Sequence, residues 1–393
     1  MDFTFSEEQQ AVVEAARAVF APVAPDGVPS PALTSGAVAD DFDRALWAKA
    51  AGADLLSLLI APDYGGAGLD AIALCLVLRE AGKVLARVPL LEHSAAAATV
   101  QAHARPEVRQ RLLPDAGRGE TVLTVASAGR TGHDTADLAV TARRAPEAGG
   151  GDRGDRDNGS DWVLDGMQTA VPWAWNADRI VVPAHTPEGA TVLALLPGPA
   201  TEVRGRTLAE QISTTGERLA ELRLEGARVA SDDVIEDPAA WPLLHALLTT
   251  GTCALALGLG ERVLAMTSDY ASKREQFGHP IATFQAVAVQ AADRYIDLRA
   301  MEVTLWQAAW RLASGAAGQL PLAGDVAVAK TWASDGVRRV VQTAQHLHGG
   351  FGADTDYPLH RYHAWAKQLE LALGPAAAHE EALGDLLATH SLG

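Results

Sequence analysis

The residues best suited to chemistry lie in the stretch 270–293, which reads YASKREQFGHPIATFQAVAVQAAD. Gly278 and Pro280 interrupt two long helix-compatible runs there, so the sequence predicts a helix end, a short break and a second helix start. Arg274 and Gln276 are therefore expected at a corner of the fold.

This corner carries the groups that a dinucleotide needs. The planar guanidinium of Arg274 fits a pyrophosphate, and Phe277 offers an aromatic face to a base. Phe284 and Gln285 add a second ring and an amide beside them. Each residue taken singly has an ordinary explanation, as a surface ion pair or a core side chain. Together they favour a dinucleotide site.

Charge and composition narrow the class of protein. The chain has 393 residues and a formal net charge of -17, with 48% hydrophobic and 5% aromatic residues. An acidic surface does not attract nucleic acid or an anionic membrane, so neither is expected as a partner. Cys75 and Cys253 lie in apolar helix-like runs, which predicts buried free thiols. No secretory signal or clean membrane span is evident, so a soluble cytoplasmic protein is expected.

Two regions precede the corner. Residues 1–116 are predicted to form an all-α domain, in which Ser6 and Gln9 have the form of a capping box. Further helices are expected over 42–51, 71–86, 90–101 and 106–113. Residues 117–236 are predicted to form a β domain, with Asp165-Gly166 as a hairpin signal and 145–161 as a polar surface excursion. Its short β-type runs are 121–126, 138–142, 162–164, 179–183, 191–196 and 219–224.

Residues 237–393 return to a helical period and predict a four-helix bundle. The segment 241–272 is apolar almost all round, with many small residues over 251–260, so it is expected to be buried and closely approached by other helices. Two further helices are expected over 324–347 and within 362–390. In the helix after the corner, one apolar stripe is expected at helical spacing, and it comprises Ala291, Tyr295, Leu298, Met301, Leu305, Ala308 and Leu312. The charged residues Arg294, Asp297 and Arg299 are expected to lie off this stripe. The predicted fold class is therefore α+β.

The corner closely resembles the R-x-x-F-G…F-Q-x-V signature of the flavin-dependent acyl-CoA dehydrogenase family. Residues 62–69, PDYGGAGL, are similar to the family turn P-E-x-x-G-G-x-G, and residues 346–352, HLHGGFG, are similar to Q-x-x-G-G-x-G. The resemblance covers the whole chain and implies an N-terminal α-helical domain, a middle β-barrel or sandwich domain and a C-terminal four-helix bundle. It also implies FAD as cofactor, an acyl-CoA as substrate and electron-transfer flavoprotein as electron acceptor.

The resemblance assigns cofactor contacts to particular residues. In the family the arginine of the corner reaches the FAD of a neighbouring subunit. FAD contacts are therefore implied for Arg274, Gln276, Phe277, Phe284, Gln285, His346, Gly349 and Gly350. His346 stands where relatives usually carry glutamine, and it can still donate one hydrogen bond. No Cys or carboxylate completes a compact ligand set around the nearby histidines, so no metal is expected.

The catalytic base of the family is missing at both of its locations. The segment from Pro358, PLHRYHAWAKQLELALGP, is similar to the family segment that ends in Y-E-G-T, where the glutamate removes the α-proton of the acyl-CoA. Leu373 stands at that glutamate position, and Leu248 stands at the alternative location on the preceding long helix. Leucine cannot accept a proton. Glu370 is the nearest carboxylate in the sequence, and a solvated helix charge is the more ordinary explanation for it.

The flavin-binding part of the β domain also departs from the family. Residues 124–134, TVASAGRTGHD, replace the T-E-P-x-x-G-S loop, and residues 170–172, AVP, replace W-I-T. The pattern therefore resembles the base-less β subunit of the α2β2 acyl-CoA dehydrogenases of steroid side-chain degradation. The sequences FDRALW at 42–47, HGGFGADTDYPLHRY at 348–362 and LALG at 371–374 carry that resemblance. It implies a base-bearing α subunit as partner and a bulky acyl-CoA as the substrate of the complex.

Three other functions remain open at this point. An active dehydrogenase could use a relocated base such as Glu370. A flavin monooxygenase of the same fold would need no α-proton base. A cofactor-free scaffold could dimerise through its C-terminal bundle alone.

Overall fold

The N-terminal part of the chain is helical. The computed structural model describes residues 4–25, 37–127, 139–145 and 161–390. The described helices here are α1 (Glu7–Phe20), α2 (Arg44–Gly52), α3 (Ala71–Lys83), α4 (Leu90–His103) and α5 (Pro106–Gly117), with the 3-10 turn η1 (Pro62–Tyr64). The predicted capping box is confirmed: the backbone N–H of Gln9 donates to Ser6 Oγ at 3.2 Å, and Gln9 Oε1 accepts from the backbone N–H of Ser6 at 3.1 Å.

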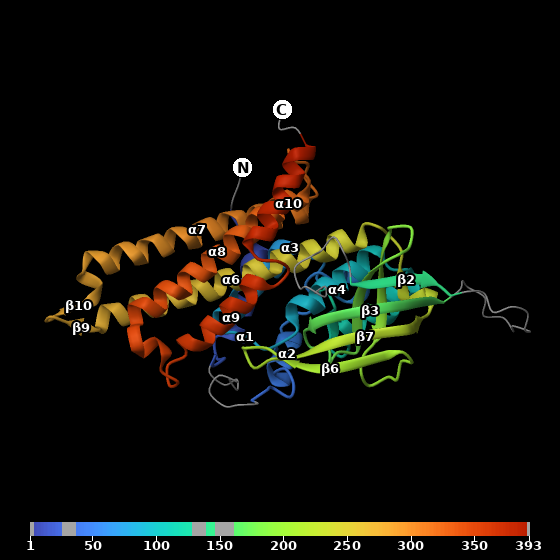
Figure 1. Cartoon of the computed structure of the whole chain (residues 1–393), viewed down its shortest axis with the longest axis horizontal. Coiled ribbons are helices and arrows are strands. Elements are labelled where there is room, and N and C mark those ends of the chain that lie inside the picture. The colour runs from blue at the N-terminus through green and yellow to red at the C-terminus, as the bar shows by residue number, and fades with distance from the viewer. Residues whose placement is uncertain (1–3, 26–36, 128–138, 146–160, 391–393) are drawn as a thin grey trace, which may run out of the picture.

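The middle of the chain forms one sheet with a separate core. Its described strands are β1 (Leu123–Val125), β2 (Val140–Arg144), β3 (Trp162–Val171), β4 (Arg179–His185), β5 (Thr191–Pro197), β6 (Arg206–Ile212), β7 (Arg218–Val229) and β8 (Val234–Ile235). Along the sheet the order is β6-β7-β3-β2-β4-β5-β8, and β1 pairs in parallel with β4. Figure 1 places this sheet at the opposite end of the molecule from the tip that carries β9 and β10. Most of the predicted excursion, residues 146–160, lies outside the described residues.

The predicted hairpin turn at Asp165-Gly166 is wrong. Strand β3 runs straight through both residues and pairs with β2 on one side and β7 on the other. The register against β7 shifts between Leu164 and Asp165, which pair with Ala227 and Glu225, so Gly226 of β7 is the extra residue of a β-bulge beside the dipeptide. Gly166 has φ of +142°, and a Cβ there would lie 2.2 Å from the carbonyl oxygen of Ala139. The glycine therefore serves a close approach of two strands.

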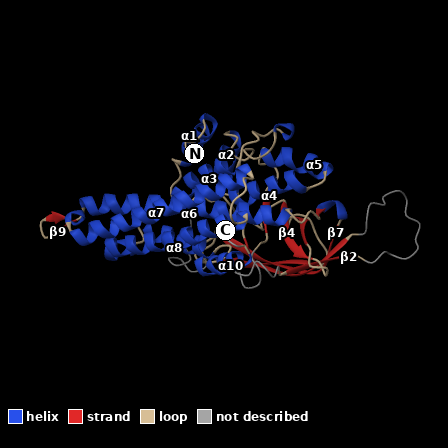
Figure 2. Cartoon of the chain, turned by 90° about the horizontal axis from the view of Figure 1, so that it is seen from above, coloured by secondary structure: helices blue, strands red, loops and turns tan. Residues whose placement is uncertain are grey.

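The C-terminal part is an elongated helix bundle (Figures 1 and 2). It comprises α6 (Ala240–Lys273), α7 (Gln285–Ser314), α8 (Leu322–His348), α9 (Leu359–Leu371) and α10 (Ala376–Thr389). The two-residue strands β9 (Glu275–Gln276) and β10 (His279–Pro280) form a hairpin between α6 and α7. The single helix predicted within 362–390 is in fact two, because the chain turns at Leu373 and Gly374, which have φ of +57° and +98°.

Helix α6 is the central element, as its composition predicts. It is long and apolar enough to cross a membrane, but 83% of its most apolar window is buried inside the fold. It crosses α3 at two facing glycines: a Cβ on Gly258 would lie 1.9 Å from the carbonyl oxygen of Arg79, and one on Gly82 would lie 2.3 Å from that of Leu255. A single apolar core joins α1–α5 to the bundle, and the sheet encloses a second one. The predicted boundaries after residues 116 and 236, and the cytoplasmic location, stay predictions.

The predicted apolar stripe on α7 is wrong at two positions. Tyr295 was expected inside and is 57% exposed, whereas Asp297 was expected outside and is 7% exposed. Asp297 is buried because Arg339 of α8 donates to its carboxylate at 2.8 Å and Arg294 approaches it at 2.9 Å. Two cations offset the loss of water around the buried charge.

Candidate functional site

The end of α6 and the start of α7 form an exposed tip, which is the predicted corner (Figure 1). Arg274 caps the C-terminus of α6, and its carbonyl oxygen accepts from the backbone N–H of Ile281 at 2.8 Å. Phe277 lies in the turn with φ of +54° and is 92% exposed, and its ring meets Phe284 edge-on at 6.2 Å. Gln285 begins α7 and is exposed. The guanidinium of Arg274 has no polar partner within the described part of the chain.

The second predicted motif lies at the same end of the bundle. Tyr270, one turn before Arg274, stacks on His348 with centroids 4.4 Å apart and on Phe351 at 5.4 Å. These contacts bind the end of α6 to the turn that follows α8. The motif residues themselves are exposed: His346 lies in the last turn of α8, and Gly349 and Gly350 begin the turn that follows it. Gly349 has φ of +60°, a conformation that favours glycine, and open space surrounds the place of its Cβ.

The structure separates the two tip motifs from the two base positions. Leu248 lies inside α6 and is 3% exposed. Leu373 is half-buried after α9, and its carbonyl oxygen lies 2.8 Å from Nε2 of His379. Burial lowers the pKa of His379 to about 4, so this ring is neutral and donates its N–H to Leu373. A leucine side chain cannot accept a proton, and the assignment of both leucines to the base positions of the family stays a prediction.

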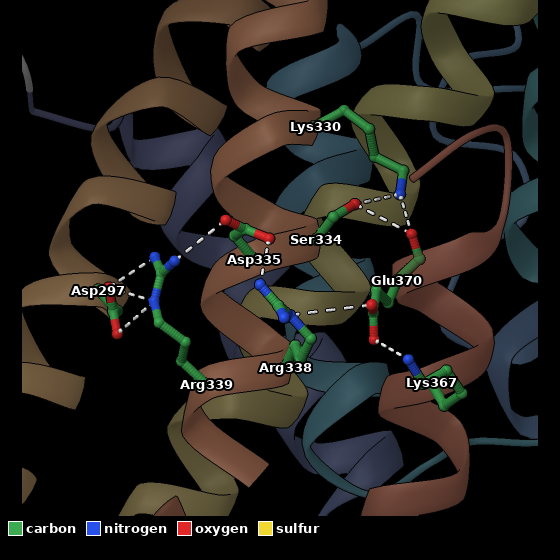
Figure 3. A network of polar contacts seen from close by, with 8 residues as sticks. All are labelled: Asp297, Lys330, Ser334, Asp335, Arg338, Arg339, Lys367 and Glu370. Atoms are coloured by element: carbon green, nitrogen blue, oxygen red, sulfur yellow. Dashed lines mark hydrogen bonds and ion pairs between the residues drawn. The ribbon is translucent and has the colours of Figure 1, made fainter. Parts of the chain in front are cut away.

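Glu370 is held in a network of charges (Figure 3). Its carboxylate lies 2.7 Å from Lys367 Nζ and 3.9 Å from Arg338 Nε. Arg338 in turn pairs with Asp335 at 2.8 Å. The network points the Glu370 carboxylate at surface cations. The Glu370 side chain is only 13% exposed, so these cations balance its charge more than water does, and its assignment as a solvated helix charge stays a prediction.

A buried lysine lies beside this network and binds the end of α9. Lys330 Nζ donates to Ser334 Oγ at 2.7 Å and to the carbonyl oxygens of Leu369 at 3.0 Å and Glu370 at 3.1 Å. Its side chain is fully buried, and burial lowers its pKa to about 8. A cation at this place complements the C-terminal dipole of α9.

A small cavity lies where the helices meet the sheet. It has a volume of about 110 Å³, and its lining includes Leu78, Val88, Leu91, Glu92, Trp173 and Leu369. The indole N–H of Trp173 donates to Glu92 Oε2 at 3.1 Å. Part of Glu92 remains accessible, but the surrounding protein is close enough to its carboxyl that burial raises its pKa. Sequence analysis missed this pair, although a lone glutamate in the apolar run LLEHSAAAATV was a signal for it.

A larger groove lies along the outer side of α7. It has a volume of about 1230 Å³ and runs between the N-terminal segment, α7 and the start of α8. Its aromatic lining is Phe5, Trp306 and Trp310, and Phe5 meets Trp306 edge-on at 5.1 Å.

Comparison with known proteins gives the class of this chain. The family model described as "Acyl-CoA dehydrogenase, N-terminal domain" matches residues 6–120, and that described as "Acyl-CoA dehydrogenase, C-terminal domain" matches residues 249–387. The chain therefore belongs to the acyl-CoA dehydrogenase family, a family of flavoprotein oxidoreductases, as its motifs predict.

Three relatives are similar to the chain over most of its length. "Acyl-CoA dehydrogenase FadE27" of Mycobacterium tuberculosis is 38% identical over 356 residues, which cover 88% of this chain and 89% of the relative. The ChsE4-ChsE5 complex from the same organism contains a chain that is 34% identical, with a TM-score of 0.85 and 99% of both chains covered. A chain of the Tcur3481-Tcur3483 steroid ACAD is 35% identical, with a TM-score of 0.83 and 98% of both chains covered.

Proposed function

We propose that this chain is the non-catalytic β subunit of an α2β2 acyl-CoA dehydrogenase, which binds FAD at a subunit interface and dehydrogenates a bulky acyl-CoA such as one with a steroid side chain. Electrons would pass to electron-transfer flavoprotein. The base-bearing α subunit would supply the proton acceptor. The observation that carries the proposal is the pair of leucines, Leu248 and Leu373, at the two base positions of the family.

The surroundings of Leu373 support a subunit without a base. Glu370 is the carboxylate nearest to it in sequence, and Lys367 Nζ lies 2.7 Å from its Oε2 while Arg338 Nε lies 3.9 Å from its Oε1. A general base must reach the proton that it removes and must be free to accept it. Two carboxylates line the nearby cavity: Glu92 accepts a hydrogen bond from Trp173, and Glu217 pairs with Arg87.

The size of the cavity supports the same conclusion. Ligand pockets have volumes of about 300–1,000 Å³. The cavity between the helices and the sheet has a volume of about 110 Å³, which is too small for a flavin ring together with an acyl chain. A cofactor shared with this subunit would therefore contact its exposed tip.

The tip fits a ligand that another subunit also holds. Arg274 presents a guanidinium fork without a polar partner among the described residues, and Phe277 presents a free aromatic face. A bidentate fork suits a pyrophosphate, and an exposed ring suits stacking on a planar base. FAD, when bound, would supply the group that accepts the β-hydride of the acyl-CoA. Arg274, Phe277 and the turn at Gly349 would hold and orient it.

A stripe along α7 supports a partner subunit. Val289, Ile296, Val303 and Trp310 follow one another at intervals of seven residues and are 52%, 63%, 69% and 40% exposed. A repeat of seven places side chains on one line of a helix, the pattern by which helices pack against one another. Exposed apolar side chains in one line on a helix support a protein interface there. We call these four residues the α7 stripe; none of them belongs to the apolar stripe that the sequence predicted for this helix.

The test compares the chain alone with the chain in its complex. Each preparation is mixed anaerobically with an acyl-CoA, and loss of the oxidised flavin absorbance is followed. We expect bleaching only in the complex, its loss when the partner's glutamate base is changed to glutamine, and its retention in Glu370→Gln of this chain. An Asp335→Asn variant serves as a matched control for loss of one charge in the same network.

Other outcomes identify the alternatives. Bleaching by the isolated chain that disappears in Glu370→Gln would establish an active dehydrogenase with a relocated base. Oxygen uptake driven by NADH would establish a monooxygenase. If preparations of the chain and of its complex both lack FAD, the cofactor-free scaffold would be the remaining function.

A further inference from the structure

Trp173 adopts a conformation that is unusual for a large side chain. Its φ is +58°, in the left-handed region that bulky residues rarely enter unless their surroundings hold them there. The preceding residue is fixed because Thr124 Oγ1 donates to the carbonyl oxygen of Pro172 at 2.6 Å. The turn thereby directs the indole to the cavity between the helices and the sheet.

Two contacts from the helical part hold the indole in this place. Its N–H donates to Glu92 Oε2 at 3.1 Å, and its ring meets Phe42 edge-on, with centroids 6.3 Å apart and an interplanar angle of 86°. The other charged groups of the cavity wall are engaged elsewhere: Glu217 pairs with Arg87 at 2.7 Å, and Arg218 pairs with Glu210 at 2.6 Å.

The motif FDRALW at 42–47 forms the support behind Trp173. Phe42 also meets Trp47 edge-on at 5.6 Å, and the indole N–H of Trp47 donates to the carbonyl oxygen of Gly119 at 2.9 Å. Asp43 caps α2, because its Oδ1 accepts from the backbone N–H of Leu46 at 2.9 Å. The motif therefore fixes the ring on which Trp173 rests.

We propose that Trp173 is a plug that fills the ligand pocket of this chain and that Glu92 is the acceptor that keeps the plug in place. Without the indole, the space would be walled mainly by aliphatic side chains such as Leu78, Val88 and Leu369, and Glu92 would lose its donor. The uncharged polar side chains of the wall have partners of their own, because Thr252 donates to the carbonyl oxygen of Leu248 and Gln368 accepts from Thr215. The space would then take an uncharged, flat, mainly apolar ligand with a single N–H or O–H donor. The proposal rests on the proposed function, in which this subunit has no working site of its own.

The test removes the indole side chain by substitution and adds indole as a free ligand. Trp173→Ala should lower Tm, and millimolar indole should raise Tm of this variant while leaving that of the wild type unchanged. An engineered apolar cavity of about 150 Å³ is sufficient to bind benzene. 1-Benzofuran has the shape of indole without its N–H and should bind Trp173→Ala more weakly by roughly tenfold, the value of one hydrogen bond to a charged or buried carboxyl. Adding Glu92→Leu should abolish that difference.

Two results would overturn the proposal. One is indole binding to the wild type as tightly as to Trp173→Ala, and the other is a folded Trp173→Ala that binds neither indole nor 1-benzofuran. If Trp173→Ala does not fold, Trp173→Leu keeps an apolar filling and benzene replaces indole as the probe. Benzene should then raise Tm of Trp173→Leu and not of the wild type, and equal shifts in both would refute the plug.

A different experiment tests the proposed function. Opening the cavity adds no base, so Trp173→Ala should leave the isolated chain unable to bleach flavin with acyl-CoA. Bleaching by the isolated wild type would contradict the proposed function and leave the indole titration unaffected.

Discussion

His93 should make this protein sensitive to mild acid. Its Nδ1 accepts from the backbone N–H of Leu123 at 3.2 Å, so Nε2 carries the proton and donates to the carbonyl oxygen of Ala116 at 3.1 Å. A second proton on the ring would place an N–H against the N–H of Leu123. The side chain is fully buried and joins α4 to the end of α5 and to β1.

The size of the effect follows from proton linkage. Burial lowers the pKa of His93 from 6.5 to about 4. The unfolded chain therefore binds more protons between these values, so the contribution to stability is complete above pH 6.5 and is lost as the pH falls toward 4. Between about pH 7.5 and about pH 5, the free energy of unfolding should fall by about 2 kcal/mol through this residue alone.

Urea unfolding of His93→Gln at both pH values measures this contribution. The glutamine amide can accept from Leu123 and donate to Ala116 but does not titrate in this range. We expect the free energy of unfolding of His93→Gln to fall by about 2 kcal/mol less than that of the wild type. His390→Gln, at an exposed histidine, should behave as the wild type. His245 and His379 are present in every variant, so their contributions to the pH dependence of stability cancel in the comparison. Equal acid sensitivity of His93→Gln and the wild type would refute the tautomer argument.

Three further predictions concern the tip, the α7 stripe and the crossing of α3 with α6. Arg274→Lys should weaken FAD binding to the complex by roughly tenfold or more in a fluorescence titration, because an ammonium cannot reproduce the fork, whereas Lys273→Arg should not. Val303→Glu should shift the complex to a smaller mass in light scattering, because it places a charge in the stripe, and Ala313→Glu on the exposed end of α7 should not. Gly258→Ala should lower the free energy of unfolding in urea by about 1–3 kcal/mol, because its Cβ would collide with the backbone of Arg79. Gly384→Ala, with open space at the same place on α10, should be neutral or mildly stabilising.

Local signals in the sequence predicted the parts of the fold that local chemistry decides. The capping box at Ser6 and the small residues of α6 correspond to a real helix start and a real close crossing. Asp165-Gly166 misled because its glycine serves a close approach of strands instead of a hairpin turn, and the strands that show this are distant in the sequence.

The errors at the site arise from contacts between distant segments. Tyr295 and Asp297 were placed on the wrong faces of α7 because the charges of α8 decide which face lies inside. The contact of Trp173 with Glu92 and Phe42 joins three separated segments, and no periodicity of one segment reveals it. The family resemblance implied FAD contacts for both Arg274 and Gly349, but no sequence pattern indicated the stack on Tyr270 that joins their two segments.

The ammonium of Lys330 also sets an order of assembly. It can leave water at low cost only when the carbonyl oxygens of Leu369 and Glu370 replace its hydration, and these belong to the last turn of α9. During synthesis α8 emerges first and must keep this lysine hydrated until α9 has been made and has docked. The interior of the bundle therefore closes only after α9 has been made, and a product that stops short of α9 retains a wet, open face that chaperones and proteases can recognise.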